Sequence, residues 1–208
     1  MTQYTPDNNN WVYVAGKIDS PIEFNHEMYG EGFYSFYLAV PRLSNYVDRL
    51  PVTVSERLLG KLDLNKGSNV VITGQFRSYN KLIEGSNRLI LTVFVREIEE
   101  KIGEIKNPNQ IYLNGYICKP PVYRTTPFKR EIADLLIAVN RAYNKSDYIP
   151  TIAWGRNARF CQSLEVGSNL KIWGRIQSRP YQKRYPNGEI KEKVAYEVSV
   201  SKMELVRI

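Results

Sequence analysis

Histidine and cysteine are almost absent from this sequence of 208 residues. It has one histidine, His26, and two cysteines, Cys118 and Cys161. A single histidine makes a histidine triad or a multi-histidine metal site unavailable or strained, and two cysteines are too few for a disulfide framework or a zinc site. We expect reduced thiols, with Cys161 in the core and His26 in a surface loop.

Long apolar runs and nucleotide-binding loops are also missing. No segment approaches the roughly 18 apolar residues of a membrane-spanning helix, and residues 1–6 do not begin a signal peptide. Neither G-x-G-x-x-G nor G-x-x-x-x-G-K followed by Ser or Thr occurs. We therefore expect no membrane association, no cofactor, no metal and no enzymatic activity.

Positive charge and aromatic rings are plentiful. Lys and Arg number 29 against 21 Asp and Glu, which gives a net charge of +8 and a pI near 9.4. Aromatic residues make up 12% of the chain, and 15 of them are tyrosines. Because cations neutralise phosphates and rings stack on bases, this composition favours a nucleic-acid partner.

The sequence consists of two similar halves. Residues 13–18 resemble residues 112–117, which lie 99 positions later. The correspondence continues in order to Gly67-Ser68-Asn69 and Gly167-Ser168-Asn169, at a spacing of 100. Matches that stay in order over about ninety residues indicate a duplicated domain.

Each half predicts a small all-β domain. A polar stretch with Gly and Pro, residues 101–109, divides the chain into domains 1–103 and 104–208. Apolar and β-branched patterns predict five strands per domain, with a helix between the third and the fourth. The expected strands are 12–14, 36–40, 52–54, 69–73 and 89–95, then 111–113, 134–139, 148–154, 169–173 and 194–200; the expected helices are 55–62 and 157–164. This pattern fits two tandem OB folds, whose surfaces bind oligonucleotides, although other small barrels share the strand count.

Five segments of the second half form an ordered pattern: Asn114-Gly115, Leu136 to Tyr143, Asp147 to Arg156, Val166-Gly167-Ser168 and Leu170 to Tyr181. Together they resemble the bacterial single-stranded DNA-binding proteins (SSBs) over nearly all of this half. Residues 38–42 and 50–54 of the first half resemble the family more faintly.

The resemblance implies an OB fold that coats single-stranded DNA, with little sequence preference, in the bacterial cytoplasm during replication, repair or recombination. RNA is a possible alternative ligand. Family members usually assemble four OB domains, so a chain with two such domains is expected to form a homodimer.

The family stacks bases on aromatic side chains, and the matching positions here are Tyr143, Tyr148, Trp154 and Tyr181. Trp173 could line the same channel or cover a neighbouring copy. Tyr148 and Trp154 share strand parity with apolar neighbours, so their face could instead belong to the core.

The corresponding positions of the first half hold no aromatic residue. They are Ser44, Arg49, Ser55 and Lys81. Residues 1–103 carry 11 basic and 12 acidic side chains, a net charge of −1, whereas residues 104–208 carry 18 and 9, a net charge of +9. We therefore expect the second domain to bind the strand and the first, diverged domain to serve structure or assembly.

Cations flank the aromatic positions, which suits a groove that holds bases by rings and phosphates by guanidinium groups. The candidates for phosphate contacts are Arg141, Arg156, Arg175, Arg179, Lys183, Arg184, Lys129 and Arg130. Arg42 and Arg57 occupy the positions of Arg141 and Arg156 in the first half, so part of that signal can be structural.

The chain ends soon after its last expected strand, with Met203 to Ile208. SSBs commonly end in a flexible acidic segment that recruits replication and repair proteins, and its absence puts that recruitment in doubt. Two alternatives follow. One is an accessory OB protein of a primosome or a mobile element, and the other is an OB protein-interaction module with weak nucleic-acid binding.

Overall fold

β-Strands dominate the protein, as the sequence predicts. The computed structural model describes residues 8–83, 85–101 and 103–206, so the segment 1–6 and the last two residues lie outside the described residues. The first half contains β1 (Asn10–Ile18), β2 (Glu23–Met28), β3 (Glu31–Pro41), β4 (Val47–Ser55), α1 (Glu56–Leu59), β5 (Asn69–Ile83) and β6 (Ser86–Glu100). The second contains β7 (Asn109–Ile117), β8 (Val122–Thr125), β9 (Glu131–Asn140), β10 (Ser146–Trp154), α2 (Arg156–Cys161), β11 (Asn169–Arg184) and β12 (Ile190–Leu205). Within the described residues, no helix has the length and apolarity needed to cross a membrane.

Five of the six strands in each half close into a barrel. β1 pairs with β3 and β5, β3 pairs with β4, β4 runs parallel to β6, and β6 returns to β5. β7, β9, β10, β12 and β11 repeat these pairings in the second half. The helix lies between the third and fourth barrel strands, as expected. Each half is therefore an OB-type barrel.

The barrels form because apolar side chains alternate along the strands. In β4, Leu50, Val52 and Val54 point inward and are at most 1% exposed. The buried side chains of both halves join in one apolar cluster, and each buried Å² contributes about 25 cal/mol to stability. Cys161, in α2, belongs to this core as expected, and burial raises the pKa of its thiol to about 11.

One short strand per half was missed by the sequence analysis. β2 and β8 add to the outer edges of β3 and β9. Their side chains are almost all exposed, so they lack the alternation that marks a strand. The expectation of a loop at His26 was wrong, because this residue lies in β2 and its ring stacks on Phe33 with 5.0 Å between centroids.

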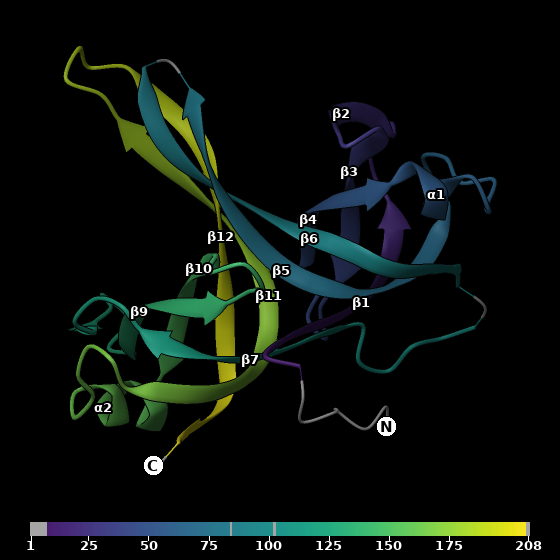
Figure 1. The fold of residues 1–208 in the computed structure, drawn as a ribbon. Coiled ribbons are helices and arrows are strands. Elements are labelled where there is room, and N and C mark those ends of the chain that lie inside the picture. Colours follow the sequence, from purple (N-terminus) through teal and green to yellow (C-terminus); the bar gives the residue numbers. More distant parts are fainter. Residues whose placement is uncertain (1–7, 84, 102, 207–208) are drawn as a thin grey trace.

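The two barrels are joined by antiparallel pairing of β1 with β7 (Figure 1). Val12 stands opposite Ile111, and these two residues are also equivalent in the sequence repeat. Pairing of equivalent residues makes the junction nearly two-fold symmetric, as in a dimer of identical subunits.

Each long hairpin is held against the other barrel by one buried aspartate. Asp48 of β4 accepts a hydrogen bond from the backbone N–H of Ser178 in β11, at 2.7 Å. Asp147 of β10 accepts the equivalent bond from Ser78 in β5, also at 2.7 Å. The hairpins β5–β6 and β11–β12 therefore cross over the junction and rise on the same side of the molecule (Figure 1).

Candidate nucleic-acid interface

Trp154 lies at the end of β10, on the outer face of the second barrel. Ile149 and Ala153 belong to the buried core, whereas Tyr148 and Trp154 are 44% and 36% exposed. The possibility that these two rings belong to the core is therefore excluded. The indole Nε1 of Trp154 donates a hydrogen bond to Ser199 Oγ on β12, at 3.1 Å, which fixes the orientation of the ring.

A groove of about 540 Å³ runs past this ring. Its cations from the second half are Arg130, Arg175 and Arg179, and Pro180 adds an apolar surface. We call this surface the Trp154 groove; its residues are Arg42, Tyr46, Arg130, Trp154, Arg175, Gln177, Ser178, Arg179, Pro180, Ser199 and Val200. Four of these residues are predicted from the sequence to make stacking or phosphate contacts, and the structure brings all four together.

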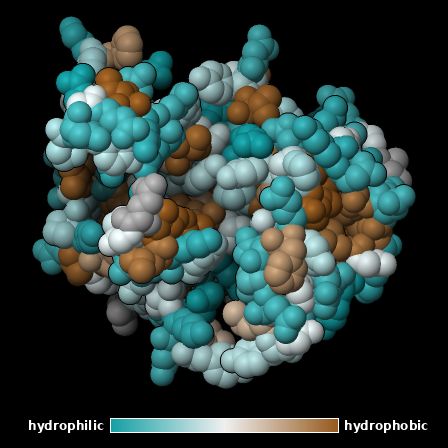
Figure 2. All heavy atoms as spheres, turned by 90° about the horizontal axis from the view of Figure 1, so that it is seen from above, coloured by the Kyte–Doolittle hydropathy of each residue, from teal (hydrophilic) through white to brown (hydrophobic). Residues whose placement is uncertain are grey.

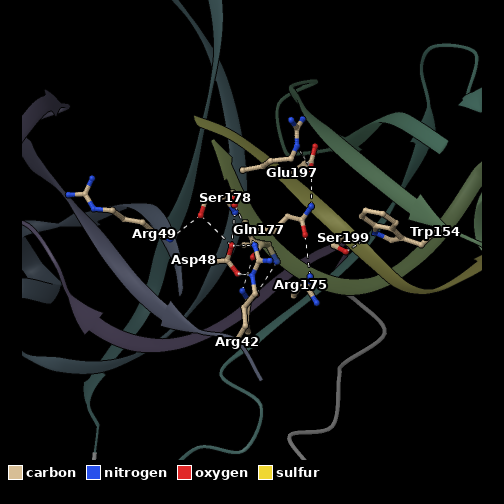
Figure 3. A network of polar contacts seen from close by, with 12 residues as sticks. Arg42, Asp48, Arg49, Trp154, Arg175, Gln177, Ser178, Glu197 and Ser199 are labelled. Atoms are coloured by element: carbon tan, nitrogen blue, oxygen red, sulfur yellow. Dashed lines mark hydrogen bonds and ion pairs between the residues drawn. The ribbon is translucent and has the colours of Figure 1, made fainter. Parts of the chain in front are cut away.

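A chain of polar contacts supports the groove floor (Figure 3). Arg175 Nη2 donates to Gln177 Oε1 at 3.3 Å, and Gln177 Nε2 donates to Glu197 Oε1 at 2.8 Å. Arg179 Nε donates to the same Glu197 oxygen at 3.3 Å. Burial and then the nearby charge of Arg42 lower the pKa of Arg175. Arg175 therefore faces the groove with a neutral partner, whereas the charge of Arg179 is partly compensated.

Two residues of the Trp154 groove come from the first half and were missed as site residues. Arg42 is ion-paired with Asp48 at 2.6 Å, and its guanidinium carbon lies 5.2 Å from the centre of the Tyr46 ring. Tyr46 is 59% exposed. The repeat alignment placed Ser44 opposite Tyr143, so the tyrosine two positions later in the same loop was overlooked. A search for rings within each loop, rather than at single positions, would have found it.

The hairpin β11–β12 carries a second set of predicted residues. Tyr181 is 38% exposed and stands opposite Lys193. Near the tip, the amines of Lys183 and Lys193 lie 5.3 and 5.6 Å from the Tyr185 ring, and a hydrogen bond to Lys193 lowers the pKa of Tyr185. Arg184 is exposed at the end of β11. On the side toward which the hairpins rise, apolar patches lie between hydrophilic side chains (Figure 2). Cations beside exposed rings suit a hairpin that closes over a strand.

The comparisons with known proteins point to one family. The model of the "Single-strand binding protein family" covers residues 108–206. "Single-stranded DNA-binding protein B" of Bacillus subtilis (strain 168) is 32% identical over an alignment of 84 residues, and the alignment covers 36% of this chain and 72% of that protein. The chain belongs to the single-strand binding protein family.

Other similar proteins extend the comparison. "Single-stranded DNA-binding protein 1" of Staphylococcus aureus (strain COL) is 35% identical over 81 residues, 36% of this chain and 48% of that protein. The chain thus spans about half the length of this curated relative. The crystal structure of the wild-type single-stranded DNA binding protein from Thermus aquaticus has a TM-score of 0.73 and 19% identity, and covers 96% of this chain and 93% of that chain. This likeness extends over both barrels and confirms the tandem OB fold.

Tyr143 and Arg141 lie apart from the Trp154 groove. Tyr143 occupies the loop between β9 and β10, with a φ of 61° and 94% exposure. It lines a different groove, next to Arg77 and Arg96 of the first half. Arg141 forms an ion pair with Asp147 at 3.4 Å, which gives it a structural partner. That these two residues contact the ligand stays a prediction. In the structure they face the first domain rather than the Trp154 groove.

Three further predicted residues surround the second barrel. Trp173 packs against Tyr112 with 5.2 Å between ring centroids, and Lys202 Nζ lies 4.6 Å from the Trp173 ring. It is not one of the residues of the Trp154 groove. Lys129 is exposed in the loop before β9, with a φ of 57°, and Arg156 is the exposed first residue of α2. The contacts of Trp173 favour a packing role.

Two of the four first-half counterparts of the stacking residues, Arg49 and Ser55, have structural partners. Ser55 caps α1 by accepting a hydrogen bond from the N–H of Arg57, at 3.2 Å. Arg49 pairs with Asp19 at 2.8 Å, and its guanidinium carbon lies 4.0 Å from the centre of the Tyr37 ring. These positions offer no free ring face to a base.

Proposed function

We propose that this protein binds single-stranded DNA without sequence preference, through the Trp154 groove. The observation that carries this proposal is an exposed indole, oriented by Ser199, beside Arg130, Arg175 and Arg179. Rings that stack on bases and cations that neutralise phosphates are the two components of a single-strand site. Family membership over residues 108–206 supports the same class of ligand.

Stacking explains why the sequence of the strand matters little. Trp154 offers its ring to one base. Tyr181, which follows the groove residue Pro180 on β11, offers its ring to a second. Each stacked base contributes about 1–3 kcal/mol, and every base has a π-face, so any base can stack. Tyr148 and Tyr143 remain predicted stacking residues. The guanidinium of Arg175 and the cations of the β11–β12 hairpin neutralise phosphates.

The two domains divide this work unequally in our proposal. Residues 104–208 carry the stacking rings, whereas residues 1–103 supply Arg42 and Tyr46 to the far wall of the groove and serve assembly. Coating single strands serves replication, repair and recombination. We expect the protein to act in the bacterial cytoplasm, at the nucleoid, as a binding protein rather than an enzyme.

We also propose a homodimer with four OB barrels. Aromatic rings gather on the outer face of the β1–β7 junction, where Trp11 stacks on Tyr13 with 6.2 Å between centroids and Trp173 packs against Tyr112. Aromatic residues are enriched in protein–protein interfaces, so a second copy suits this face. Light scattering should give twice the chain mass at micromolar concentration, and a monomer mass would contradict the proposal.

Fluorescence titration with oligo-dT tests the binding function. The emission of Trp154 should be quenched when a base stacks on it. The affinity should fall with salt, with a log–log slope of about −0.7 for each neutralised phosphate. Duplex DNA of the same length is the control, and oligo-rU compares RNA with DNA. Equal affinity for duplex and single strand, or an affinity that does not change with salt, would contradict the proposal.

A further inference from the structure

A second groove lies on the opposite side of the junction and is built by both domains. Arg77 and Arg96 of the first half line it together with Arg141, Tyr143 and Lys145 of the second, around a volume of about 690 Å³. We call this surface the Arg77 groove. It mirrors the Trp154 groove, where Arg42 and Tyr46 of the first half approach the second barrel. In each groove, one wall comes from a barrel and the opposite wall comes from the loop before the third barrel strand of the other domain.

The two arginines that the first half gives to the Arg77 groove, Arg77 and Arg96, share one neutral acceptor. Arg77 donates to Gln75 Oε1 through Nε at 3.2 Å and through Nη2 at 2.8 Å. Arg96 Nη2 approaches the same oxygen at 3.5 Å. The Arg77 guanidinium carbon lies 3.9 Å from the centre of the Phe94 ring, which holds it flat against the barrel. No carboxylate of the described residues lies within 4 Å of either arginine.

The neighbouring charges compensate this positive cluster only in part, because Asp147 is the one carboxylate named among the charges that act on Arg77. Burial, followed by the charges of Arg96 and Arg141, lowers the pKa of Arg77 to about 10, so the side chain is still charged at neutral pH. The nearby carboxylate of Asp147 already accepts from the Ser78 N–H at 2.7 Å and pairs with Arg141 at 3.4 Å. Three arginines near a single carboxylate still repel one another, and a bound anion relieves that repulsion.

At two aligned positions the two halves carry the same residue types in the opposite order, so the alignment alone does not reveal this groove. The second half has Arg175 and Gln177 on the outer face of β11, and the first half has Gln75 and Arg77 at the equivalent positions of β5. In both halves the arginine donates to the glutamine across one intervening residue. The first barrel therefore keeps the arginine–glutamine pair of the second barrel in the reverse order.

We propose that the Arg77 groove binds the phosphate backbone of the same single strand that stacks in the Trp154 groove. The groove offers the guanidinium groups of Arg77 and Arg96 and the ammonium group of Lys145, and Arg77 itself covers the face of the neighbouring Phe94 ring. Phosphodiester groups match these donors in charge and geometry. One strand then contacts both domains across the junction. This inference rests on the proposed function and extends it to a second groove, in which the first domain supplies Arg77 and Arg96.

The double variant Arg96→Gln/Lys145→Gln tests the inference, because both side chains are exposed and neither fills the core. The control Lys17→Gln/Lys66→Gln removes the same charge from other exposed positions of the first domain. Each protein is titrated with an oligo-dT of about 8 nucleotides and with one of about 30, because one OB fold covers about 4–16 nucleotides. Trp154 quenching reports the short strand, and the anisotropy of a labelled strand reports the long one.

The double variant should bind the long strand several-fold more weakly, with a salt slope smaller by about 1.4, which corresponds to two lost phosphate contacts. Its affinity for the short strand should equal that of the parent. An unchanged long-strand affinity, an equal loss for both lengths, or an equal loss in the control would overturn the inference. If the parent protein binds neither strand, the proposed function fails and this inference fails with it.

Discussion

The two barrels share one order of strands but differ in the position and exposure of the aromatic ring on their outer face. The second barrel ends β10 with the exposed Trp154, whereas the first ends β4 with Ser55, which is 8% exposed and caps α1. At the position of Ser199, which receives the Trp154 hydrogen bond, the first barrel has Phe94, and the Arg77 guanidinium covers that ring. The two barrels thus share their order of strands, but the ring at this site is exposed in the second barrel and covered by a guanidinium in the first.

The comparison also shows that net charge per domain is a poor guide to binding surfaces. Residues 1–103 sum to −1, yet Arg77 and Arg96 stand together in a groove with no carboxylate of the described residues within 4 Å. Local arrangement decides the potential that a ligand meets, because exposed charges beyond about 8–10 Å are largely screened by salt.

The largest expected effect concerns the buried aspartates that join the halves. Asp48→Ala removes a carboxylate that accepts from Arg42 at 2.6 and 2.7 Å and from the Ser178 N–H at 2.7 Å. Loss of one partner of a buried ion pair costs about 3–5 kcal/mol of unfolding free energy. Urea unfolding, followed by circular dichroism, measures this loss.

Asp147→Ala, the matched change in the second half, should cost less. Asp147 meets Arg141 only at 3.4 Å, and burial raises the pKa of its carboxyl group, so its charged form is less well stabilised. Equal losses for Asp48→Ala and Asp147→Ala would show that the two sides of the junction are energetically equivalent.

Tyr181→Ala should weaken single-strand binding by about 1–3 kcal/mol, the contribution of one stacked base. Lys81→Ala changes the aligned residue of the first-half hairpin and should have a much smaller effect, because lysine has no π-face. Anisotropy titration with labelled oligo-dT compares the two variants. A loss for Lys81→Ala as large as that for Tyr181→Ala would break the asymmetry between the hairpins.

The arginines of the Trp154 groove should differ in their effect on salt dependence. Arg175→Gln should reduce the log–log slope by about 0.7, the value for one phosphate contact. Arg179→Gln should reduce it less, because Glu197 already lies 3.3 Å from Arg179. Titrations at several salt concentrations give both slopes, and a greater reduction for Arg179→Gln would contradict this order.

Ser55→Ala should have the smallest effect on binding. Its hydroxyl caps α1 and also contacts the Glu31 carboxylate, so stability should fall by about 1 kcal/mol. The affinity for oligo-dT should not change. Parallel thermal unfolding and titration separate the two quantities, and a loss of affinity without loss of stability would place the strand at the end of β4, where this account expects no contact.

Much of the fold could be predicted because strong local patterns encode it. The duplication, the barrel strands and the helix after the third of them follow from buried alternation and repeated turns. The exposed strands β2 and β8 lack that alternation, and the outer parts of the long hairpins stand in solvent. Their pairing depends on partners in the folded chain rather than on local sequence.

The candidate site was only partly predictable. Trp154, Arg175 and Arg179 lie on the second barrel, so local parity and resemblance were enough to group them. Tyr143 was grouped with them as well, but the crossing of the barrels places it beside the first domain. Tyr46 makes the reciprocal contribution from the first half. Sequence position alone does not indicate which barrel a loop faces after two domains pack together.

The central claim is that Trp154 carries the single-strand site, and Trp154→Ala tests it most directly. Anisotropy titration with labelled oligo-dT should show a loss of about 1–3 kcal/mol. The melting temperature is followed alongside, because part of any loss could reflect a damaged barrel. An affinity equal to that of the parent, in a variant that melts at the parent temperature, would contradict the account.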